Sequence, residues 1–247
     1  MYLLHLLYLV KNFHLEESRY ALASKLYVAV DCIIFGFDDG ELKILVFNRQ
    51  VAPLKGMWSL IGSFVLINES AEAAGKRVLK DFTGLDDIFM EELKTYSDVA
   101  RDSGARCISI GQYALIRLTE KNTNLAAKYG AKWFEVSKVP DLVLDHNQMV
   151  ADGLQRLRNV AQFYPIGLEL LPKKFTIPQL QKLYEEIFQK KMDTRNFRKK
   201  LLSLNILIQL DEKDKSGSKK GAFLYEFDYA KYRKLKNKGF SFSLFKV

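Results

Sequence analysis

The electric charge of this chain changes sign about two thirds of the way along its length. Residues 165–247 carry 19 lysines and arginines against 9 aspartates and glutamates, a net charge of +10. Residues 1–164 carry 19 against 20, a net charge of −1, so the second part accounts for the whole excess of +9. The change coincides with the segment YPIGLELLPKKFT, whose prolines and glycine interrupt any helical pattern.

A chain of 247 residues, 48% of them hydrophobic, is long enough for two domains, each with its own core. We expect an N-terminal extension over residues 1–24, then domains over residues 25–164 and 165–247. Because the positive charge is confined to the second domain, we expect a polyanionic partner, with nucleic acid favoured over an anionic membrane surface.

The apolar segment at residues 1–10 is too short to span a bilayer and lacks the basic start and the cleavage pattern of a signal peptide. We interpret it as a packing segment or an uncertain translation start, with a signal-like function as the remaining alternative. Cys32 and Cys107 both lie in apolar runs, with no second cysteine or histidine at the spacing of metal ligands. This pattern predicts buried free thiols in a cytoplasmic protein.

The first domain shows strand-like and helix-like segments. The runs at 27–37 and 42–47 are rich in β-branched and aromatic residues and flank a DDG turn, which predicts a hairpin. Further strands are expected at 107–116 and 131–136, and a helix from Asp145 to about residue 161. These elements favour an α/β fold with a mixed sheet.

Residues 62–85, GSFVLINESAEAAGKRVLKDFTGL, predict a loop followed by an amphipathic helix over 70–83. Ser70 is the candidate N-cap, and Gly84 offers a left-handed stop. Gly75 in the helix interior costs about 1 kcal/mol relative to alanine. Either the helix packs closely there or the cost is tolerated.

Residues from about 27 to 150 resemble a Nudix hydrolase domain. That family holds divalent metals against a diphosphate with the motif Gly-x5-Glu-x7-Arg-Glu-aliphatic-x-Glu-Glu-x-Gly-aliphatic. Aligned on WSLIGSFV, Ser63 stands at the leading glycine, and the frame is kept by Glu69, Arg77, Gly84 and Leu85. The three carboxylates expected after the arginine fall on Val78, Asp81 and Phe82.

Those three positions are i, i+3 and i+4, so they converge on one patch of a helix. Mg²⁺ requires several oxygen ligands, and Asp81, even with Glu69, makes a poor cage. We therefore expect no metal, no cofactor, no catalytic residue and no hydrolysis, with Val78 and Phe82 in the core. Arg77, without its family glutamate partner, is expected to pair with Asp81 or to contact a ligand.

The segment RDSGARCISIGQYALI resembles a loop and strand of Nudix-related regulators, with Ser103 where that family has proline. Its polar residues are either one wall of a ligand cleft or solvated loop charges. A cleft without a metal cage favours a ligand held by hydroxyl hydrogen bonds and ring stacking, which points to a sugar. The candidate effector-binding residues are Arg49, Trp58, Phe64, Arg77, Asp81, Arg101, Asp102 and Arg106.

The second domain contains two helix patterns and a basic hairpin. Thr176 and Gln179 form a capping box, and an apolar face follows as far as Phe188. After a turn at 190–192, Asp193 caps a second helix, TRNFRKKLLSL. Strands at 206–210 and 222–227 flank the loop DEKDKSGSKKG.

This half closely resembles the winged helix-turn-helix of Nudix-related transcriptional regulators, and the two resemblances together cover about 220 of the 247 residues. A recognition helix places its N-terminal residues on base edges, where arginine can read guanine and asparagine adenine. Asn196 has an alternative role in the first turn of its own helix. Wing residues would contact phosphates. The predicted DNA-binding residues are Thr194, Arg195, Asn196, Arg198, Lys199, Lys200, Lys215, Ser216, Ser218, Lys219 and Lys220.

The fold implied is a Nudix-like α/β/α sandwich with a mixed sheet, joined to a small winged helix-turn-helix domain. The resemblance implies a cytoplasmic, homodimeric regulator, such as a repressor, whose silent first domain senses a metabolite and whose second domain binds operator DNA. A pentose such as arabinose is preferred as the effector, with ADP-ribose as the alternative. Two rivals remain: a weak hydrolase of nucleoside diphosphate derivatives acting through Glu69 and Asp81, and a module that binds RNA or acidic proteins.

Overall fold

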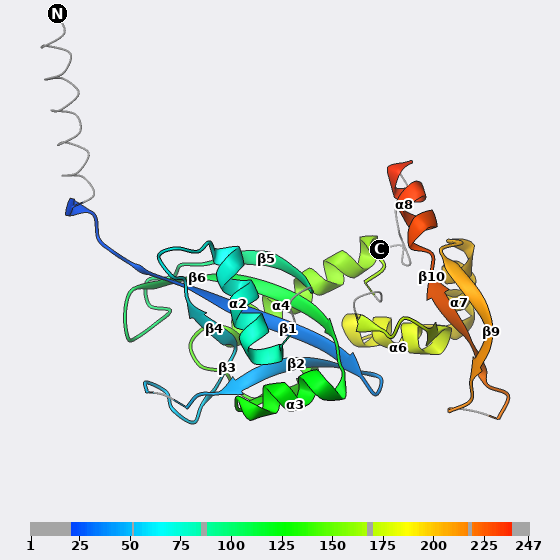
Figure 1. Cartoon of the computed structure of the whole chain (residues 1–247), viewed down its shortest axis with the longest axis horizontal. Helices are drawn as coiled ribbons and strands as arrows, with labels where there is room; N and C mark the ends of the chain where they lie inside the picture. Colours follow the sequence, from blue (N-terminus) through cyan, green and yellow to red (C-terminus); the bar gives the residue numbers. More distant parts are fainter. Residues whose placement is uncertain (1–20, 51, 85–87, 167–169, 217–218, 239–247) are drawn as a thin grey trace, which may run out of the picture.

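The computed structural model describes residues 21–50, 52–84, 88–166, 170–216 and 219–238. A mixed sheet of seven strands forms the centre of its N-terminal domain (Figure 1). The strand order is β3-β2-β1-β6-β5, with β4 beside the first half of β1 and β7 beside β2. β1 and β6 run parallel, and the other pairs are antiparallel. The strands are β1 (Tyr27–Asp38), β2 (Glu41–Asn48), β3 (Trp58–Ser59), β4 (Ile61–Phe64), β5 (Phe89–Tyr96), β6 (Cys107–Arg117) and β7 (Ala131–Glu135).

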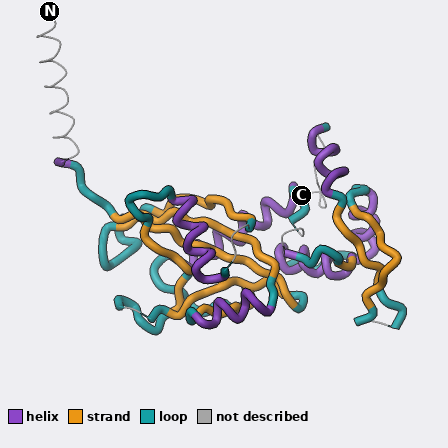
Figure 2. Tube along the Cα trace, in the orientation of Figure 1, coloured by secondary structure: helices purple, strands orange, loops and turns teal. Residues whose placement is uncertain are grey.

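Helices cover both faces of this sheet, and β1 is therefore buried on both sides (Figure 2). Cys32 and Ile34 face the layer that contains α2 (Ala71–Thr83) and α3 (Glu120–Lys128). Ile33 and Phe35 face α4 (His146–Phe163), which follows a short 3-10 turn, η1 (Val136–Lys138). The predicted α/β/α sandwich with a mixed sheet is therefore confirmed. The sequence did not indicate β3, β4, β5 or α3.

Among the described residues, the winged-helix domain contains the helices α6, α7 and α8 and a three-stranded sheet in the order β8-β10-β9. α6 and α7 form the predicted helix-turn-helix, and β9 and β10 form the predicted wing. The last helix, α8, was not predicted. The elements are β8 (Phe175–Thr176), α6 (Ile177–Phe188), α7 (Thr194–Ser203), β9 (Leu207–Asp214), β10 (Ala222–Phe227) and α8 (Tyr229–Asn237).

The two domains do not have separate cores, contrary to the prediction. One buried apolar cluster runs from the α4 face of the sheet into the winged-helix domain, and α6 packs against both α4 and β2. The hydrophobic effect therefore holds the first helix of the helix-turn-helix directly on the sheet. The cluster includes Phe35, Ile44, Met149, Leu157, Leu183, Tyr184, Phe197 and Tyr225.

Several local predictions can be compared with the structure. Cys32 and Cys107 are buried and free, as expected, and burial raises the pKa of the Cys32 thiol to about 12. Gly75 packs closely: a Cβ there would clash with the side-chain amide of Gln112 on β6. The apolar segment at residues 1–10 lies outside the described residues. Among those described, no helix has both the length and the apolar character needed to cross a membrane.

Candidate functional site

The loop and helix that align with the Nudix motif keep the expected shape. The Ser70 hydroxyl accepts a hydrogen bond from the Ala73 N–H at 3.1 Å, and Gly84 ends α2 with a φ of 71°. Val78 is 1% exposed against the sheet, and Phe82 packs edge-on against the rings of Phe47 and Tyr129. The prediction that both side chains belong to the core is confirmed.

Arg77 pairs with Glu69 and not with Asp81, so the first of its two predicted alternatives is wrong. Its guanidinium donates to the Glu69 carboxylate at 2.6 and 3.1 Å, and to the Phe64 carbonyl at 3.2 Å. The loop before α2 folds back over the helix and so brings these residues together across eight positions. Glu69 also accepts from the Leu66 N–H at 2.9 Å. The hydrogen bond from Arg77, followed by that from Leu66, lowers the pKa of Glu69.

The donor set at the motif does not fit a hard divalent cation. Glu69 is occupied by Arg77 and a backbone N–H, Asp81 is exposed on the surface of α2, and Val78 and Phe82 supply no oxygen. Within the described part of the chain, no three histidine, cysteine or carboxylate side chains are grouped closely enough to hold a metal ion. Mg²⁺ needs near-octahedral oxygen coordination, and these residues do not provide it.

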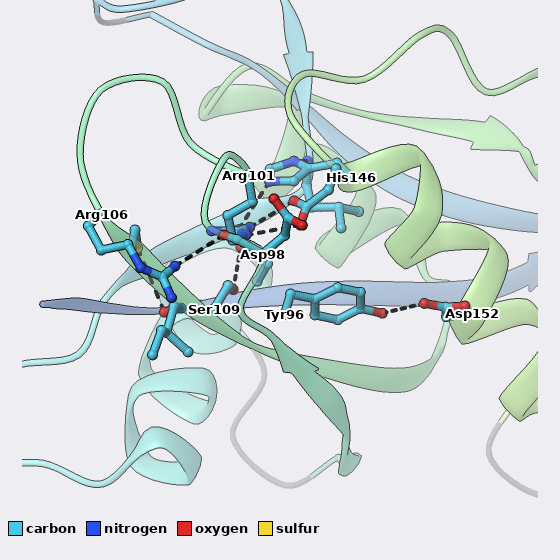
Figure 3. Close-up of polar contacts among 12 residues, drawn as sticks. Tyr96, Asp98, Arg101, Arg106, Ser109, His146 and Asp152 are labelled. Carbon is cyan, nitrogen blue, oxygen red and sulfur yellow. Dashed lines mark hydrogen bonds and ion pairs between the residues drawn. The ribbon is translucent and has the colours of Figure 1, made fainter.

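A buried polar cluster of the N-terminal domain lies on the α4 side of the sheet (Figure 3). Arg101, 7% exposed, donates to both oxygens of Asp145 at 2.9 and 2.8 Å and lies 3.5 Å from Asp31. The Ser109 hydroxyl donates to Asp31 at 2.6 Å. We call these residues, together with His146, the Arg101 cluster.

His146 completes the Arg101 cluster at the start of α4. Its Nδ1 accepts the Leu60 N–H at 3.0 Å, so the neutral ring carries its proton on Nε2, which lies 3.6 Å from Asp31. Burial lowers the pKa of His146, and the nearby carboxylates of Asp31 and Asp145 only partly oppose this effect. His146 is therefore neutral near pH 7.

The predicted effector residues of the loop before β6 hold that loop in shape. The Arg101 guanidinium is engaged in the ion pairs with Asp145 and Asp31 described above. Asp102 accepts the Gly104 N–H at 2.8 Å, and Arg106 donates to the carbonyls of Ser97 and Asp98, each at 3.1 Å. A shallow hollow of about 410 Å³ lies beside them. It is lined by Asp98, Ala100, Arg101, Ser103, Leu144 and Asp145.

The other predicted effector residues fall in two further places. Arg49 donates to the Pro53 carbonyl at 3.2 Å, and Trp58 packs edge-on against Phe134, which makes it partly a core residue. Phe64 is 54% exposed, and its ring centroid lies 5.3 Å from that of Tyr27, itself 57% exposed. The eight residues are therefore distributed over the loop before β6, the Nudix-like loop and helix, and the region of β2 and β3.

Tyr27 was missed by the sequence analysis, although it connects two of these places. Its ring contacts Phe64 beside the Nudix-like loop, and its backbone N–H donates to the Arg106 carbonyl at 3.1 Å. Exposed aromatic rings side by side offer a stacking surface for a planar ligand group. Asp31 and Ser109 were also missed, yet a carboxylate inside an apolar strand such as YVAVDCIIF requires a buried partner.

In the winged-helix domain, local sequence rules predicted the helix ends correctly. Thr176 and Gln179 form the reciprocal capping box of α6. The Asp193 carboxylate accepts the Asn196 N–H at 2.8 Å and so caps α7, while Phe197 and Leu201 are buried. The backbone of Asn196 thus serves the first turn of its helix.

Most of the predicted DNA-binding residues lie on an exposed surface. Lys200 is half-buried, Ser218 lies outside the described residues, and the Arg198 guanidinium lies 3.5 Å from the Tyr225 hydroxyl. The Thr194 hydroxyl accepts a hydrogen bond from Gln181 at 3.2 Å. The exposed residues are Thr194, Arg195, Asn196, Arg198 and Lys199 on α7, and Lys215, Ser216, Lys219 and Lys220 in the wing.

The turn between α6 and α7 is held by two buried polar side chains that the sequence analysis did not identify. Glu185 accepts the Met192 N–H at 2.9 Å and Gln181 at 3.0 Å, while Gln181 also donates to the Met192 carbonyl at 3.0 Å. Burial alone would raise the pKa of Glu185, but the hydrogen bonds from Met192, Gln181 and Lys191 lower it. This pair fixes the start of α7 relative to α6.

Comparison with known proteins adds independent information. Residues 167–227 match the model described as the NrtR DNA-binding winged helix domain. The ADPR responsive transcriptional repressor NtrR of Acinetobacter baylyi is 27% identical over 83% of each chain. The ADP-ribose pyrophosphatase of Methanocaldococcus jannaschii is 34% identical over 57% of this chain and 80% of its own. Shewanella oneidensis NrtR, crystallised with a 27mer DNA, superposes with a TM-score of 0.71 at 26% identity over 81% of this chain and 93% of that one.

Proposed function

Since this chain belongs to the NrtR-like regulators, in which a Nudix-fold domain precedes a C-terminal winged-helix DNA-binding domain, we propose that ADP-ribose is the ligand that changes its affinity for operator DNA. We propose further that the Nudix-fold domain binds this ligand without hydrolysing it. The observation that carries the DNA-binding part is the exposed N-terminal face of α7. Arg195, Asn196 and Arg198 lie on it, next to a turn that Gln181 and Glu185 hold in place.

ADP-ribose replaces the sugar that the sequence analysis preferred. The two relatives above are named for ADP-ribose, as an ADPR responsive repressor and an ADP-ribose pyrophosphatase, whereas the preference for a pentose gains no support from them. ADP-ribose contains an adenine, a planar group, and the exposed rings of Tyr27 and Phe64 offer it a stacking surface. The diphosphate requires cations, and Arg106 belongs to the loop whose backbone contacts Tyr27.

Binding without hydrolysis follows from the donor set on α2. Hydrolysis in this family depends on carboxylates that hold metal ions against the diphosphate, and here Arg77 already occupies Glu69. The second candidate function is a weak ADP-ribose hydrolase, which the 34% identity to a pyrophosphatase favours. Mg²⁺-dependent product release that disappears in an Asp81→Ala variant would support this candidate.

α4 provides a physical connection between the ligand domain and the DNA-binding domain. Its first turn is joined to the loop before β6 through Arg101 and Asp145. Three turns further on, the Arg158 guanidinium donates to the carbonyl of Ile187, at the end of α6, at 2.9 Å. A ligand acts on DNA binding only through a difference in affinity between two arrangements. We propose that movement of α4 relative to α6 distinguishes them.

The experiment begins with duplexes selected from a randomised library by the full-length protein. Operator affinity is then measured by gel shift with no ligand, with ADP-ribose and with arabinose. We expect selective binding to one sequence and a change of at least fivefold with ADP-ribose alone. A response to arabinose alone would contradict the choice of effector, and equal affinity for scrambled duplexes would favour a module that binds RNA or acidic proteins.

Assembly as a homodimer belongs to the same proposal. Two recognition helices related by a two-fold axis would read half-sites centred about 34–36 Å apart, one turn of the double helix. The selected duplexes should then contain an inverted repeat with that spacing. Sedimentation of the protein at micromolar concentration should give twice the 28.5 kDa mass of the chain.

A further inference from the structure

α8 is a strongly basic helix that lies beyond the matched winged-helix region, which ends at residue 227. Residues 229–238 contain five lysines and arginines and no acidic residue. They therefore contribute half of the net charge of +10 in residues 165–247. The cations are Lys231, Arg233, Lys234, Lys236 and Lys238.

α8 is fixed to the winged-helix domain at its first turn. The Asp228 carboxylate accepts the Lys231 N–H at 2.9 Å and caps the helix, while the Asp228 N–H donates to the Ile206 carbonyl at 2.9 Å. The Phe227 ring packs against Tyr229 and Tyr232, with centroids 5.2 and 5.4 Å apart. Ile206 follows the end of α7 by three residues, so α8 begins beside the end of the recognition helix.

The charged face of α8 points away from these contacts. Arg233, Lys234 and Lys238 are exposed, and none of them forms an ion pair with a carboxylate of the described chain. Lys236 lies over the ring of Tyr164 at 5.3 Å. Lys234 and Lys238 are four residues apart, a spacing at which like charges repel on a helix. A polyanion would relieve this repulsion, since no carboxylate among the described residues pairs with these cations.

The position of α8 complements that of the wing. Figure 1 shows α8 at one end of β10 and the hairpin between β9 and β10 at the other, with α7 alongside these strands. Six residues of strand separate the two ends, a distance of about 20 Å. The wing cations Lys215, Lys219 and Lys220 therefore lie at the far end of the ribbon from the α8 cations.

We propose that α8 binds the phosphate backbone of the operator on the flank of α7 opposite the wing. The proposal rests on the DNA-binding function above and extends its surface by one element. Phosphate contacts position a protein on DNA without reading sequence. α8 should therefore strengthen binding equally on all duplexes and steepen its dependence on salt. Tyr232 and Leu235 of α8 pack against the domain core, while Tyr229 is 55% exposed. One exposed ring among these cations favours DNA over a membrane surface as the partner.

The test uses a full-length variant with Arg233→Ala, Lys234→Ala and Lys238→Ala. Folding should be preserved because the three positions are exposed and alanine favours a helix. The matched control, Lys25→Ala, Lys55→Ala and Lys128→Ala, removes the same charge from exposed sites on the N-terminal domain. Affinity is measured from 50 to 200 mM salt, on the selected operator and on a scrambled duplex. Loss of three phosphate contacts lowers the salt slope by about 2.7.

Over that range of salt, the wild-type protein should lose about 40-fold more affinity than the α8 variant on both duplexes, and the control should behave like the wild type. An unchanged slope in the α8 variant would overturn the proposal. So would binding to vesicles of anionic phospholipid that the α8 variant alone loses while its DNA affinity stays intact. If the wild type binds no duplex at all, the DNA-binding function itself fails, which is a distinct outcome.

Discussion

At the scale of single residues, base reading and phosphate binding are separable on this surface. Arg195 is exposed at the N-terminal end of α7, while Lys219 lies in the wing. We expect Arg195→Ala to relax specificity at one base pair and to cost about 1–3 kcal/mol of binding free energy, because arginine reads guanine through two hydrogen bonds. Lys219→Ala should weaken all sequences alike and flatten the salt slope. Equal losses on every duplex for both variants would contradict the assigned docking.

Arg101 has a structural role that its predicted role in ligand binding did not include. Replacing it with methionine leaves the buried Asp31 and the half-buried Asp145 without their cation. Breaking a buried ion pair typically costs about 3–5 kcal/mol, and urea unfolding should show a loss of this size for Arg101→Met. Arg106→Met removes hydrogen bonds to two carbonyls only and serves as the control. A loss of less than about 1 kcal/mol in Arg101→Met would show that the pair contributes little to stability.

Protonation of His146 should lower the free energy of unfolding as the pH falls. Burial lowers its pKa below the ordinary value of 6.5. The unfolded chain therefore binds the proton more readily, and stability is lost as pH falls below about 6.5. Unfolding between pH 7.5 and 5.5 should show this loss in the wild type but not in His146→Gln. An identical pH profile in His146→Gln would assign the dependence to other groups.

At the scale of elements, local rules predicted what local contacts determine. Ser70, Asp193 and the pair Thr176 and Gln179 cap their helices as expected, because each cap depends on residues within one turn. The predicted pairing of Arg77 with Asp81 was wrong because the loop before α2 folds back and places Glu69 beside Arg77. The Arg101 cluster could not be derived, since Asp31 and Ser109 are 78 positions apart in sequence and meet only when β1 and β6 pair.

The turn that positions α7 is sensitive to a single substitution. Glu185→Ala leaves the Met192 N–H without its acceptor, which should cost about 1–3 kcal/mol of stability and lower operator affinity about tenfold. Glu186→Ala on the same helix breaks only an ion pair with Lys182, so stability and operator affinity should both change little. Melting temperature and gel shift on the two variants provide the measurement. Unchanged operator affinity in Glu185→Ala would mean that the turn holds its shape without this side chain.

At the scale of the whole molecule, charge segregation predicted the division of function but not the packing. The positive half binds DNA in the proposed function, yet its first helix shares a core with the sheet. Composition cannot reveal this continuity, since it depends on which faces of α4 and α6 meet. α8 was missed for a similar reason: its few apolar residues make a weak helical pattern, and contacts with Phe227 fix it in place.

Coupling between ligand and DNA is expected to pass through the hydrogen bond between Arg158 and the end of α6. Arg158→Met should leave ADP-ribose affinity unchanged while reducing, by about fivefold, the change in operator affinity that ADP-ribose causes. Arg156→Met is the control, because Arg156 lies on the same helix but pairs with Glu91 inside the N-terminal domain. Full coupling retained in Arg158→Met would place the connection elsewhere.

The most direct measurement is to incubate the protein with ADP-ribose, Mg²⁺ and its selected operator, and to follow operator affinity and the state of the nucleotide in one sample. Recognition without turnover predicts that operator affinity changes while ADP-ribose is recovered intact after many binding cycles. Release of AMP and ribose 5-phosphate, with no change in operator affinity, would contradict it.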